Sequence, residues 1–325
     1  MTTTEEGFAS LDSYYSEARY NLRWSSVFVL PGWLRVWWQS FGDGAELYLR
    51  TVRQGDEIIG IAPLFIRDKT ASLIGGADVC DYLDFVPAHG REEEFFSVLL
   101  DDLIERGVSN LDLGPLRPDS NVLNYLVAIA RNRNYPVLCP EEGVSVELDL
   151  PASWDEYLAL LATKQRHELK RKLRRLEEAG NVAYRCMEVS PPQVDCFMDT
   201  FLGLFALSWE EKAEFMTPRR ESFFRSLAKA MAEAKLLRFG VLELNAVTVA
   251  VIMGFDYNDT MYLYNSAYDP DYRDLSVGLL SKALCIKASI ERGRRRWDFL
   301  KGGEPYKYQL GGSEIPLYRC EIRIN

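Results

Sequence analysis

The first half of the chain shows an order of apolar patterns that predicts alternating helices and strands. Residues 31–42 and 91–107 repeat apolar positions at helical spacing, and Gly107 ends the second segment as a helix C-cap would. Residues 45–68 contain two strand-like runs around Gln54-Gly55-Asp56, the pattern of a β-hairpin. Further strands are expected at 70–76, 108–116 and 144–150, with a helix at 121–134.

The second half opens with a long helical pattern and then repeats this order. Residues 153–180 have helical spacing, with Ser153 in the N-cap position, Glu156 three residues later and Gly180 at the end. There follow, in order, a strand at 182–189, helices near 191–208 and 218–234, three strands within 235–269, a helix after Arg273, a strand at 296–302 and closing strands within 306–324. Because hairpin, strand, helix and strand recur in one order, the sequence predicts two similar halves.

Composition and charge fit two domains of an ordinary globular protein. The 325 residues are 47% hydrophobic and 26% charged, a length and composition that suit two domains. The net charge of −10 divides into −12 for residues 1–150 and +2 for residues 151–325. We therefore predict an α/β (α+β) fold with domains at 1–150 and 151–325, each a mixed sheet flanked by helices. So acidic a chain is not expected to bind DNA.

The same survey disfavours several classes of protein and site. No apolar run approaches the roughly 20 residues that a membrane-spanning helix needs, so membrane insertion is not expected. Residues 1–10 lack the basic start of a signal peptide. The six cysteines are scattered without CxxC spacing, and we expect them to be reduced thiols of a cytoplasmic protein. With only His89 and His167, a metal site is not expected.

A candidate anion site lies in residues 269–278. The strand with Tyr262 and Tyr264 leads through an Asp-Pro turn into an apolar helix that has Gly278 in its first turn. The unpaired N–H groups and the dipole of a helix N-terminus favour a phosphate, and Arg273 adds positive charge. The alternative is an ordinary strand-to-helix turn.

The segment Arg273-x-x-Ser276-Val277-Gly278 resembles the pyrophosphate loop of the GNAT acyltransferase superfamily, Gln/Arg-x-x-Gly-x-Gly/Ala, with Ser276 in place of the first Gly. The resemblance implies that this loop binds an acyl-CoA. It further implies that Leu263, Tyr264 and Asn265, at the end of the preceding strand, hold the pantetheine and the acyl carbonyl. The alternative for the tyrosines is packing on one sheet face.

A wider resemblance covers about residues 30–315. The segments KQRHELKRKLRRLEEAG, YNSAYDPDYRDLSVG and WDFLKGGEPYKYQLGG are similar to the CelD/BcsL-type (BioF2-like) acetyltransferases, which are related to the FemABX peptidyltransferases with two GNAT domains in tandem. The resemblance implies tandem GNAT-like halves. The second would bind acetyl-CoA or another acyl-CoA and carry catalysis, and the first, degenerate half would serve the acceptor or the structure.

Four residues near the end of the chain are candidates for the reaction itself. Glu304 and Tyr306 lie in the Gly-flanked stretch GGEPYKYQLGG, where a carboxylate can accept the amine proton and a phenol can protonate the departing thiolate. Lys307 is a candidate for binding phosphate or carboxylate. Asp298 alternates with Trp297 and Phe299 on a strand and is expected on the opposite face, lining a cleft or facing water.

Candidates for the acceptor site come from three regions. The helix at 164–175 is dense in basic residues, and Lys164, Arg166 and His167 at its start could steer CoA, a polyanionic acceptor or tRNA; a solvated basic face is the alternative. Asp78, Asp81 and Asp84 are spaced by three and could bind an amine, although turn chemistry is favoured. In the segment at 208–216, Trp209 and Glu210 could line the acceptor site, or the segment could be a helix end.

The sequence thus predicts an acyltransferase that moves an acyl group, expected to be acetyl, from acyl-CoA to an amine or hydroxyl of a small molecule or saccharide. One alternative is an aminoacyl-tRNA-dependent peptidyltransferase like FemABX, although residues 180–191 are too few for the helical hairpin of its best-known form. The other is a non-catalytic protein that senses CoA or acts as a scaffold.

Overall fold

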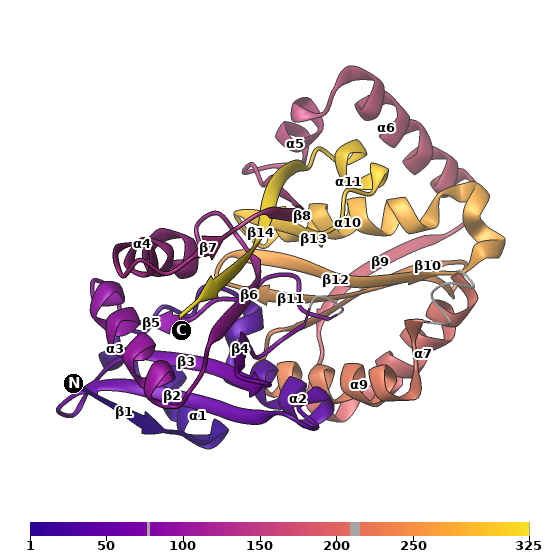
Figure 1. Cartoon of the computed structure of the whole chain (residues 1–325). Coiled ribbons are helices and arrows are strands. Elements are labelled where there is room, and N and C mark those ends of the chain that lie inside the picture. The colour runs from indigo at the N-terminus through magenta and orange to yellow at the C-terminus, as the bar shows by residue number, and fades with distance from the viewer. Residues whose placement is uncertain (77–78, 209–214, 325) are drawn as a thin grey trace. The chain divides into compact units, whose positions relative to one another are not determined.

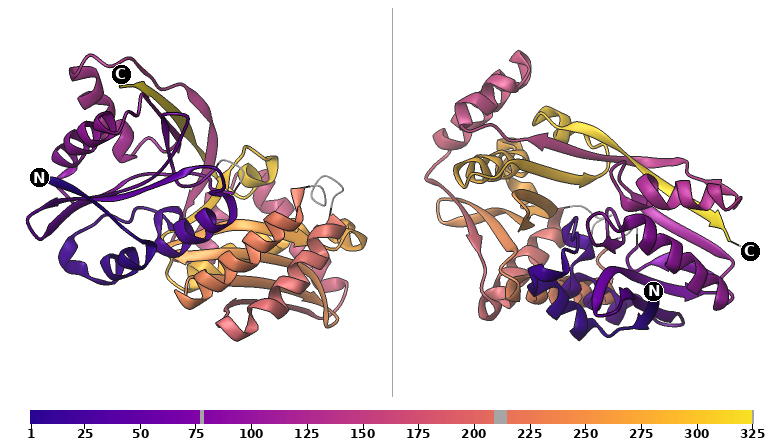
Figure 2. Two further views of the ribbon diagram at one scale, coloured as in Figure 1. Left: turned by 60° about the horizontal axis from the view of Figure 1, so that its bottom comes forward. Right: turned by 90° about the vertical axis from the view of Figure 1, so that its left-hand side faces the viewer.

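The computed structural model describes residues 1–76, 79–208 and 215–324 (Figure 1). Contacts divide the chain into two compact units, Met1–Val144 with Ile315–Asn325 and, between them in sequence, Ser145–Glu314. The sequence-based division at residue 150 did not anticipate that the end of the chain packs with the first unit. Figure 2 traces this last strand, in yellow, to the C-terminus.

The first unit is a mixed sheet with helices. Its strands are β1 (Thr2–Glu5), β2 (Glu46–Gln54), β3 (Glu57–Arg67), β4 (Thr70–Leu73), β5 (Val86–Pro87), β6 (Asn110–Leu116), β7 (Val137–Leu138) and most of β14 (Ser313–Arg323). Its helices are α1 (Phe8–Ser16), α2 (Pro31–Phe41), α3 (Glu92–Glu105) and α4 (Val127–Asn132), with short turns at Ala18–Tyr20 and Val27–Val29 and a π-helical turn at Val122–Leu126 before α4. The predicted hairpin at 45–68 is confirmed as β2 and β3, which pair antiparallel.

The second unit has the same kind of sheet. Its strands are β9 (Val182–Glu188), β10 (Leu237–Leu244), β11 (Val247–Tyr257), β12 (Thr260–Tyr268), β13 (Arg296–Lys301) and the second half of β8 (Glu141–Asp149). Its helices are α5 (Trp154–Leu160), α6 (Thr163–Glu178), α7 (Val194–Ser208), α9 (Pro218–Glu233), α10 (Val277–Glu291) and α11 (Pro305–Gln309), with short turns at Pro191–Gln193 and η5 (Pro270–Leu275).

The strand order is the same in both units. In the first unit β1, β2, β3 and β4 pair antiparallel in sequence, β4 pairs parallel with β6, and β6 pairs antiparallel with β14. In the second unit β9 to β12 pair antiparallel, β12 pairs parallel with β13, and β13 pairs antiparallel with β8. Each parallel connection carries a helix, α3 or α10, as a parallel crossover requires. The predicted mixed α/β fold with sheets flanked by helices is therefore confirmed.

Helices cover both faces of the second sheet (Figure 1). Helix α10 packs on β10, β11 and β12 from one side, and α7 packs on β11 and β12 and also contacts α9. The central strand β11 is almost continuously apolar and buried, as expected for a strand covered on two faces. On the α7 side, Phe201 and Phe224 pack by their rings against Phe239 and Tyr264.

Two predicted elements differ from the structure. The helix expected at 153–180 is broken, because Leu161 and Ala162 have extended backbone with ψ of 141° and 144°. Ser153 still caps α5, accepting a hydrogen bond from Glu156 N at 3.2 Å. The break buries the Leu161 side chain and lets α6 pack on η5 and α10. The strand expected from Tyr306 is instead the short helix α11, and the closing strand begins at Ser313.

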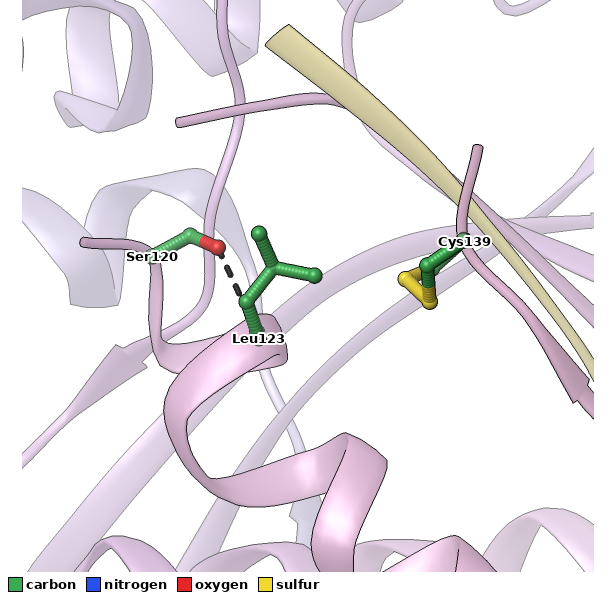
Figure 3. Close-up of a disulfide and its surroundings, with 4 residues drawn as sticks. Ser120, Leu123 and Cys139 are labelled. Atoms are coloured by element: carbon green, nitrogen blue, oxygen red, sulfur yellow. Dashed lines mark hydrogen bonds between the residues drawn. A yellow bond between two sulfur atoms is a disulfide. The ribbon is translucent and has the colours of Figure 1, made fainter. Parts of the chain in front are cut away.

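The expectation that all six cysteines are reduced was wrong. Cys139 and Cys320 form a disulfide although they lie 181 residues apart, which links the segment before β8 to β14 (Figure 3). The pairing arises because β14 returns to the first unit, a contact that spacing along the sequence does not reveal. Cys80, Cys186, Cys196 and Cys285 are free. The expected cytoplasmic location rested partly on reduced cysteines and loses that support.

Two further observations concern membranes and metal ions. No helix among residues 1–76, 79–208 and 215–324 combines the length and apolar character needed to cross a membrane. Within the same described residues, no three His, Cys, Asp or Glu side chains are placed together to hold a metal ion.

Candidate functional site

The predicted anion site is built from η5 and the first turn of α10. Asp269 Oδ1 accepts a hydrogen bond from Asp271 N at 3.0 Å, which starts the turn. Ser276 then takes a left-handed conformation with φ of 58°, which is uncommon for a residue other than Gly. Its carbonyl oxygen accepts from Leu279 N at 3.0 Å and Leu280 N at 2.9 Å, so the chain passes directly into the helix.

The start of α10 presents backbone donors. The first N–H groups of any helix lack partners within that helix. Among the described residues, no hydrogen bond uses the N–H of Val277 or Gly278, whereas the N–H of Ser276 donates to Arg273 O at 2.9 Å. The Arg273 side chain is exposed beside this turn, and the first turn of α10 holds no acidic residue. Together these groups favour an anion.

Lys172 of α6 adds a second cation, and the sequence analysis did not single it out. Its Nζ donates a hydrogen bond to Ser276 Oγ at 2.6 Å, so the basic helix reaches the loop. Lys172 is half-buried and lies between the buried Leu169 and Leu176 on the packed side of α6. A helical projection would have shown Lys172, like Arg166, beside the leucines of the apolar side, which is the signal that was available.

Gly278 is explained by packing rather than by a ligand alone. A Cβ at this position would lie 2.9 Å from Cδ1 of Tyr268, at the end of β12. Such a contact is too short for carbon atoms, so the aromatic ring requires Gly here. The position of Tyr268 is itself held in place, because its N–H donates a hydrogen bond to Ser208 Oγ of α7 at 3.0 Å.

The parallel strands β12 and β13 stop pairing partway along β12, before the chain reaches this loop. Their register covers Thr260–Tyr262 opposite Arg296–Asp298. Just beyond, β12 bulges against β11, with Leu263 and Tyr264 opposite the single residue Gly254. β13 bulges against β8 between Asp298 and Lys301, where Leu300 has φ of 64°. Bulges end pairing and redirect a strand, so the β13-facing backbone of residues 263–265 lies beyond the shared ladder.

The residues expected to hold the pantetheine face different ways. Leu263 is 4% exposed and belongs to the apolar core that α10 covers. Tyr264 is half-buried on the opposite face, where its ring packs on Phe224 and Phe255. Asn265 Oδ1 accepts a hydrogen bond from Ser266 N at 2.8 Å. Their shared feature is therefore the backbone of the bulge, while the side chains of Leu263 and Tyr264 serve packing.

Asp298 lies where the two strands stop pairing. It is 2% exposed, which excludes the solvent-facing alternative, and its neighbours Trp297 and Phe299 lie in the core on the α10 side. Its Oδ1 accepts a hydrogen bond from Leu300 N at 2.8 Å and so supports the bulge of β13.

Lys307 does not have the surroundings of a phosphate ligand, and we correct that assignment. The side chain is 2% exposed, and Nζ donates to the carbonyl oxygens of Leu300, Lys301 and Gly302 at 2.8 to 2.9 Å. Nζ is also 2.9 Å from Glu304 Oε2. An ammonium has only three protons, so these partners use its capacity within the turn after β13.

Tyr306 is connected to the helix of the predicted loop. The Lys282 ammonium of α10 lies 4.9 Å from the centre of the Tyr306 ring and donates to Gly278 O at 2.8 Å. Burial, with a smaller contribution from the Glu304 carboxylate, raises the pKa of the Tyr306 phenol well above its usual value. Tyr306 therefore keeps its proton at neutral pH. Glu304 is exposed and ion-paired with Lys307.

The acceptor-site candidates are less closely linked to the loop. Lys164 and His167 are exposed and Arg166 is half-buried near the start of α6, about one and a half to two turns before Lys172. Asp81 is half-buried in the first unit. Asp84, its neighbour in the same segment, is buried and accepts from Phe85 N at 2.9 Å, in line with turn chemistry. Asp78, Trp209 and Glu210 lie outside the described residues.

Comparisons with known proteins agree with this architecture. No curated protein sequence matches the chain closely enough to be a relative. The crystal structure of FemX superimposes with a TM-score of 0.63 at 11% identity, covering 98% of this chain and 97% of FemX. A conserved protein of unknown function from Bacteroides thetaiotaomicron VPI-5482 gives a TM-score of 0.62 at 12% identity, covering 99% of both chains. Residues 163–308 match the family described as Acetyltransferase (GNAT) domain. The second unit thus contains a segment that matches the GNAT acetyltransferase domain, and the chain as a whole shares its fold with FemX.

Proposed function

We propose that the protein is an acyltransferase that binds an acyl-CoA, with acetyl as the expected acyl group, in its second unit. It would transfer the acyl group to an amine or hydroxyl of a small molecule or saccharide. The observation that carries the proposal is the start of α10, where two unused N–H groups and the cations of Arg273 and Lys172 meet. This donor set suits a pyrophosphate. The resemblance to CelD/BcsL-type acetyltransferases favours the same function.

The first unit offers a contrast that supports one donor site per chain. Its crossover helix α3 occupies the same place in the strand order as α10 but begins with Glu92, Glu93 and Glu94. Three carboxylates in the first turn repel a phosphate. The first unit is therefore assigned to the acceptor or to structure.

The chain's own residues suggest how the reaction proceeds. The bound thioester supplies the activated acyl group. The bulge of β12 offers the N–H and C=O groups of residues 263–265 to position the extended part of the donor and its carbonyl. Tyr306, whose phenol keeps its proton at neutral pH, is the candidate for donating a proton to the departing thiolate. Asp298, at the end of the β12–β13 ladder, is the candidate for accepting the proton of the acceptor. Juxtaposing the two substrates supplies much of the rate enhancement.

Isothermal titration with acetyl-CoA and the unreactive desulfo-CoA tests the donor site. We expect micromolar binding with one site per chain, weakened about tenfold or more in Arg273→Ala and in Lys172→Ala because each loses a charge-assisted phosphate contact. Arg171→Ala is the matched control, since Arg171 is an exposed neighbour of Lys172 that pairs with Glu168 at 2.7 Å. Its affinity should stay within about twofold of wild type. Absence of binding by the wild-type protein would overturn the proposal.

An aminoacyl-tRNA donor is the second candidate, favoured by the exposed basic residues of α6 together with the FemX-like fold. If it is correct, the protein should bind aminoacyl-tRNA but not acetyl-CoA, and Lys164→Glu should weaken tRNA binding. A non-catalytic CoA sensor is distinguished by acetyl-CoA binding without acyl transfer to any amine or hydroxyl in an acceptor screen.

A further inference from the structure

Two free cysteines lie close together away from the predicted donor loop. Cys186 of β9 and Cys285 of α10 have their sulfur atoms 4.0 Å apart, with the Cys285 thiol donating to Cys186. Cys285 is fully buried and Cys186 is half-buried. β9 pairs with β10 along one edge, and α10 packs on β9, so both sulfurs are held by regular structure.

Cys186 has surroundings that favour a thiolate. Arg292, at the end of α10, donates from Nη1 to Cys186 Sγ at 3.2 Å, and its Nη2 donates to the Cys186 carbonyl oxygen. The hydrogen bond from Cys285 and the charge of Arg292 outweigh burial and lower the pKa of the Cys186 thiol to about 7. The thiolate is the reactive form of cysteine. The titratable groups around the pair are Tyr184, Arg238, Lys287 and Glu291 in addition to Arg292.

A surface pocket gives access to this sulfur. Its volume is about 350 Å³, and it is lined by Tyr184 and Cys186 of β9 and by Leu284, Lys287, Ala288, Glu291 and Arg292 of α10. Small oxidants can therefore reach Cys186, while Cys285 behind it stays buried. This is the arrangement of a reactive cysteine next to a resolving one.

We propose that Cys186 and Cys285 form a reversible, peroxide-sensitive dithiol, a modification site separate from the acyltransferase function. The Cys186 thiolate attacks the distal oxygen of a hydroperoxide; a sulfur–oxygen bond forms, the oxygen–oxygen bond breaks, and the alkoxide or hydroxide that leaves takes a proton from water. Sulfur is oxidised by two electrons and the peroxide is reduced. Cys285 then attacks the Cys186 sulfenic acid, a sulfur–sulfur bond forms, and the hydroxyl leaves with the thiol proton as water.

The disulfide would join β9 to the middle of α10. The sulfur atoms must close from 4.0 Å to the roughly 2.05 Å of a disulfide bond, which small changes of side-chain angle and backbone can provide. Since the proposed donor loop is at the start of the same helix, the oxidised and reduced proteins should be compared in acetyl-CoA titrations. The existence of the dithiol does not depend on that result.

The test is peptide mapping after brief treatment with hydrogen peroxide and alkylation of the remaining thiols. We expect a peptide with Cys186 linked to the peptide with Cys285, with the loss of two hydrogen atoms, reversed by dithiothreitol. Cys186 and Cys196 share a tryptic peptide because no Lys or Arg separates them, so a Cys196→Ser protein serves as the parent. In Cys285→Ser the sulfenic acid should persist and be captured by dimedone at Cys186.

Two variants make the result decisive. Arg292→Ala should slow alkylation of Cys186 by iodoacetamide at pH 7 by about tenfold, because less thiolate is present. Lys287→Ala, a change in the same pocket without contact to the sulfur, should leave the rate within about twofold. The proposal is overturned if peroxide yields no Cys186–Cys285 link in a folded protein, or if Cys186 reacts no faster than the exposed Cys196 of the unmodified chain.

Discussion

Lys307 holds the turn after β13 from inside, and this role can be tested by its removal. Lys307→Met leaves three carbonyl oxygens without their donor, so we expect the free energy of unfolding to fall by about 2–4 kcal/mol. Glu304→Gln removes only an exposed partner and should cost less than about 1 kcal/mol. Urea unfolding measures both. If Lys307→Met unfolds like wild type yet loses acetyl-CoA affinity, the sequence-based assignment to the cofactor would be right after all.

Because of the buried Asp84 carboxyl group, we expect the free energy of unfolding of the first unit to depend on pH. Burial, although opposed by hydrogen bonds from Asn121 and Phe85, raises its pKa from 3.8 to about 7. The folded state thus holds a proton that the unfolded chain releases near pH 4. This proton contributes at most about 4 kcal/mol to the free energy of unfolding. The contribution is fully present below pH 4, falls as the pH rises to 7, and is lost above pH 7.

The matching experiment compares wild type with Asp84→Asn from pH 4 to 8. Asn cannot ionise, so the free energy of unfolding of the variant should change less across this range, although its value is lower because an amide accepts fewer of the hydrogen bonds from Asn121. Other titrating groups cancel in the difference between the two proteins. Equal pH slopes would show that the Asp84 pKa is close to its ordinary value.

At the scale of elements, sequence patterns predicted those elements whose formation depends on residues close together in the sequence. The hairpin of β2 and β3 follows from Gln54-Gly55-Asp56, and the start of α10 follows from an Asp-Pro turn before an apolar helix. The bulges of β12 and β13 depend on the register with strands far away in sequence, which no local pattern contains. The contact of Lys172 with Ser276 likewise depends on how α6 packs, 104 residues from the loop.

The disulfide also acts between elements, since it links β14 covalently to the segment before β8. A bond that closes a loop of this length restricts the unfolded chain, so Cys320→Ser should lower stability by about 2–4 kcal/mol. Cys139→Ser should have the same effect, and the double variant should lose no more than either alone, because one bond is broken in each case. Thermal unfolding with and without dithiothreitol measures this. A wild-type midpoint that dithiothreitol leaves unchanged would contradict it, and Cys196→Ser is the control.

At the scale of the whole molecule, the chain completes the sheet of its first unit with its last residues. β14 pairs with β6 through Ile322 opposite Leu111 and Cys320 opposite Leu113, and Ile322 and Cys320 are buried. Deleting residues 315–325 removes that strand and leaves the apolar edge of β6 without a partner. We expect hydrogen exchange in β6 to accelerate strongly while β10 and β11 of the second unit keep their protection, since exchange reports the stability of local cooperative units.

Comparison with Cys320→Ser separates the strand from the disulfide in this experiment. That variant loses the covalent link but keeps the β6–β14 ladder, so β6 should stay more protected in it than in the truncated chain. If exchange in β6 is the same in the two proteins, the disulfide, and not the strand, stabilises this edge. If β10 and β11 lose protection together with β6, the two units unfold as one, and the shared strand order has not made them independent. Either result would show how far a chain built from two similar sheets behaves as two domains.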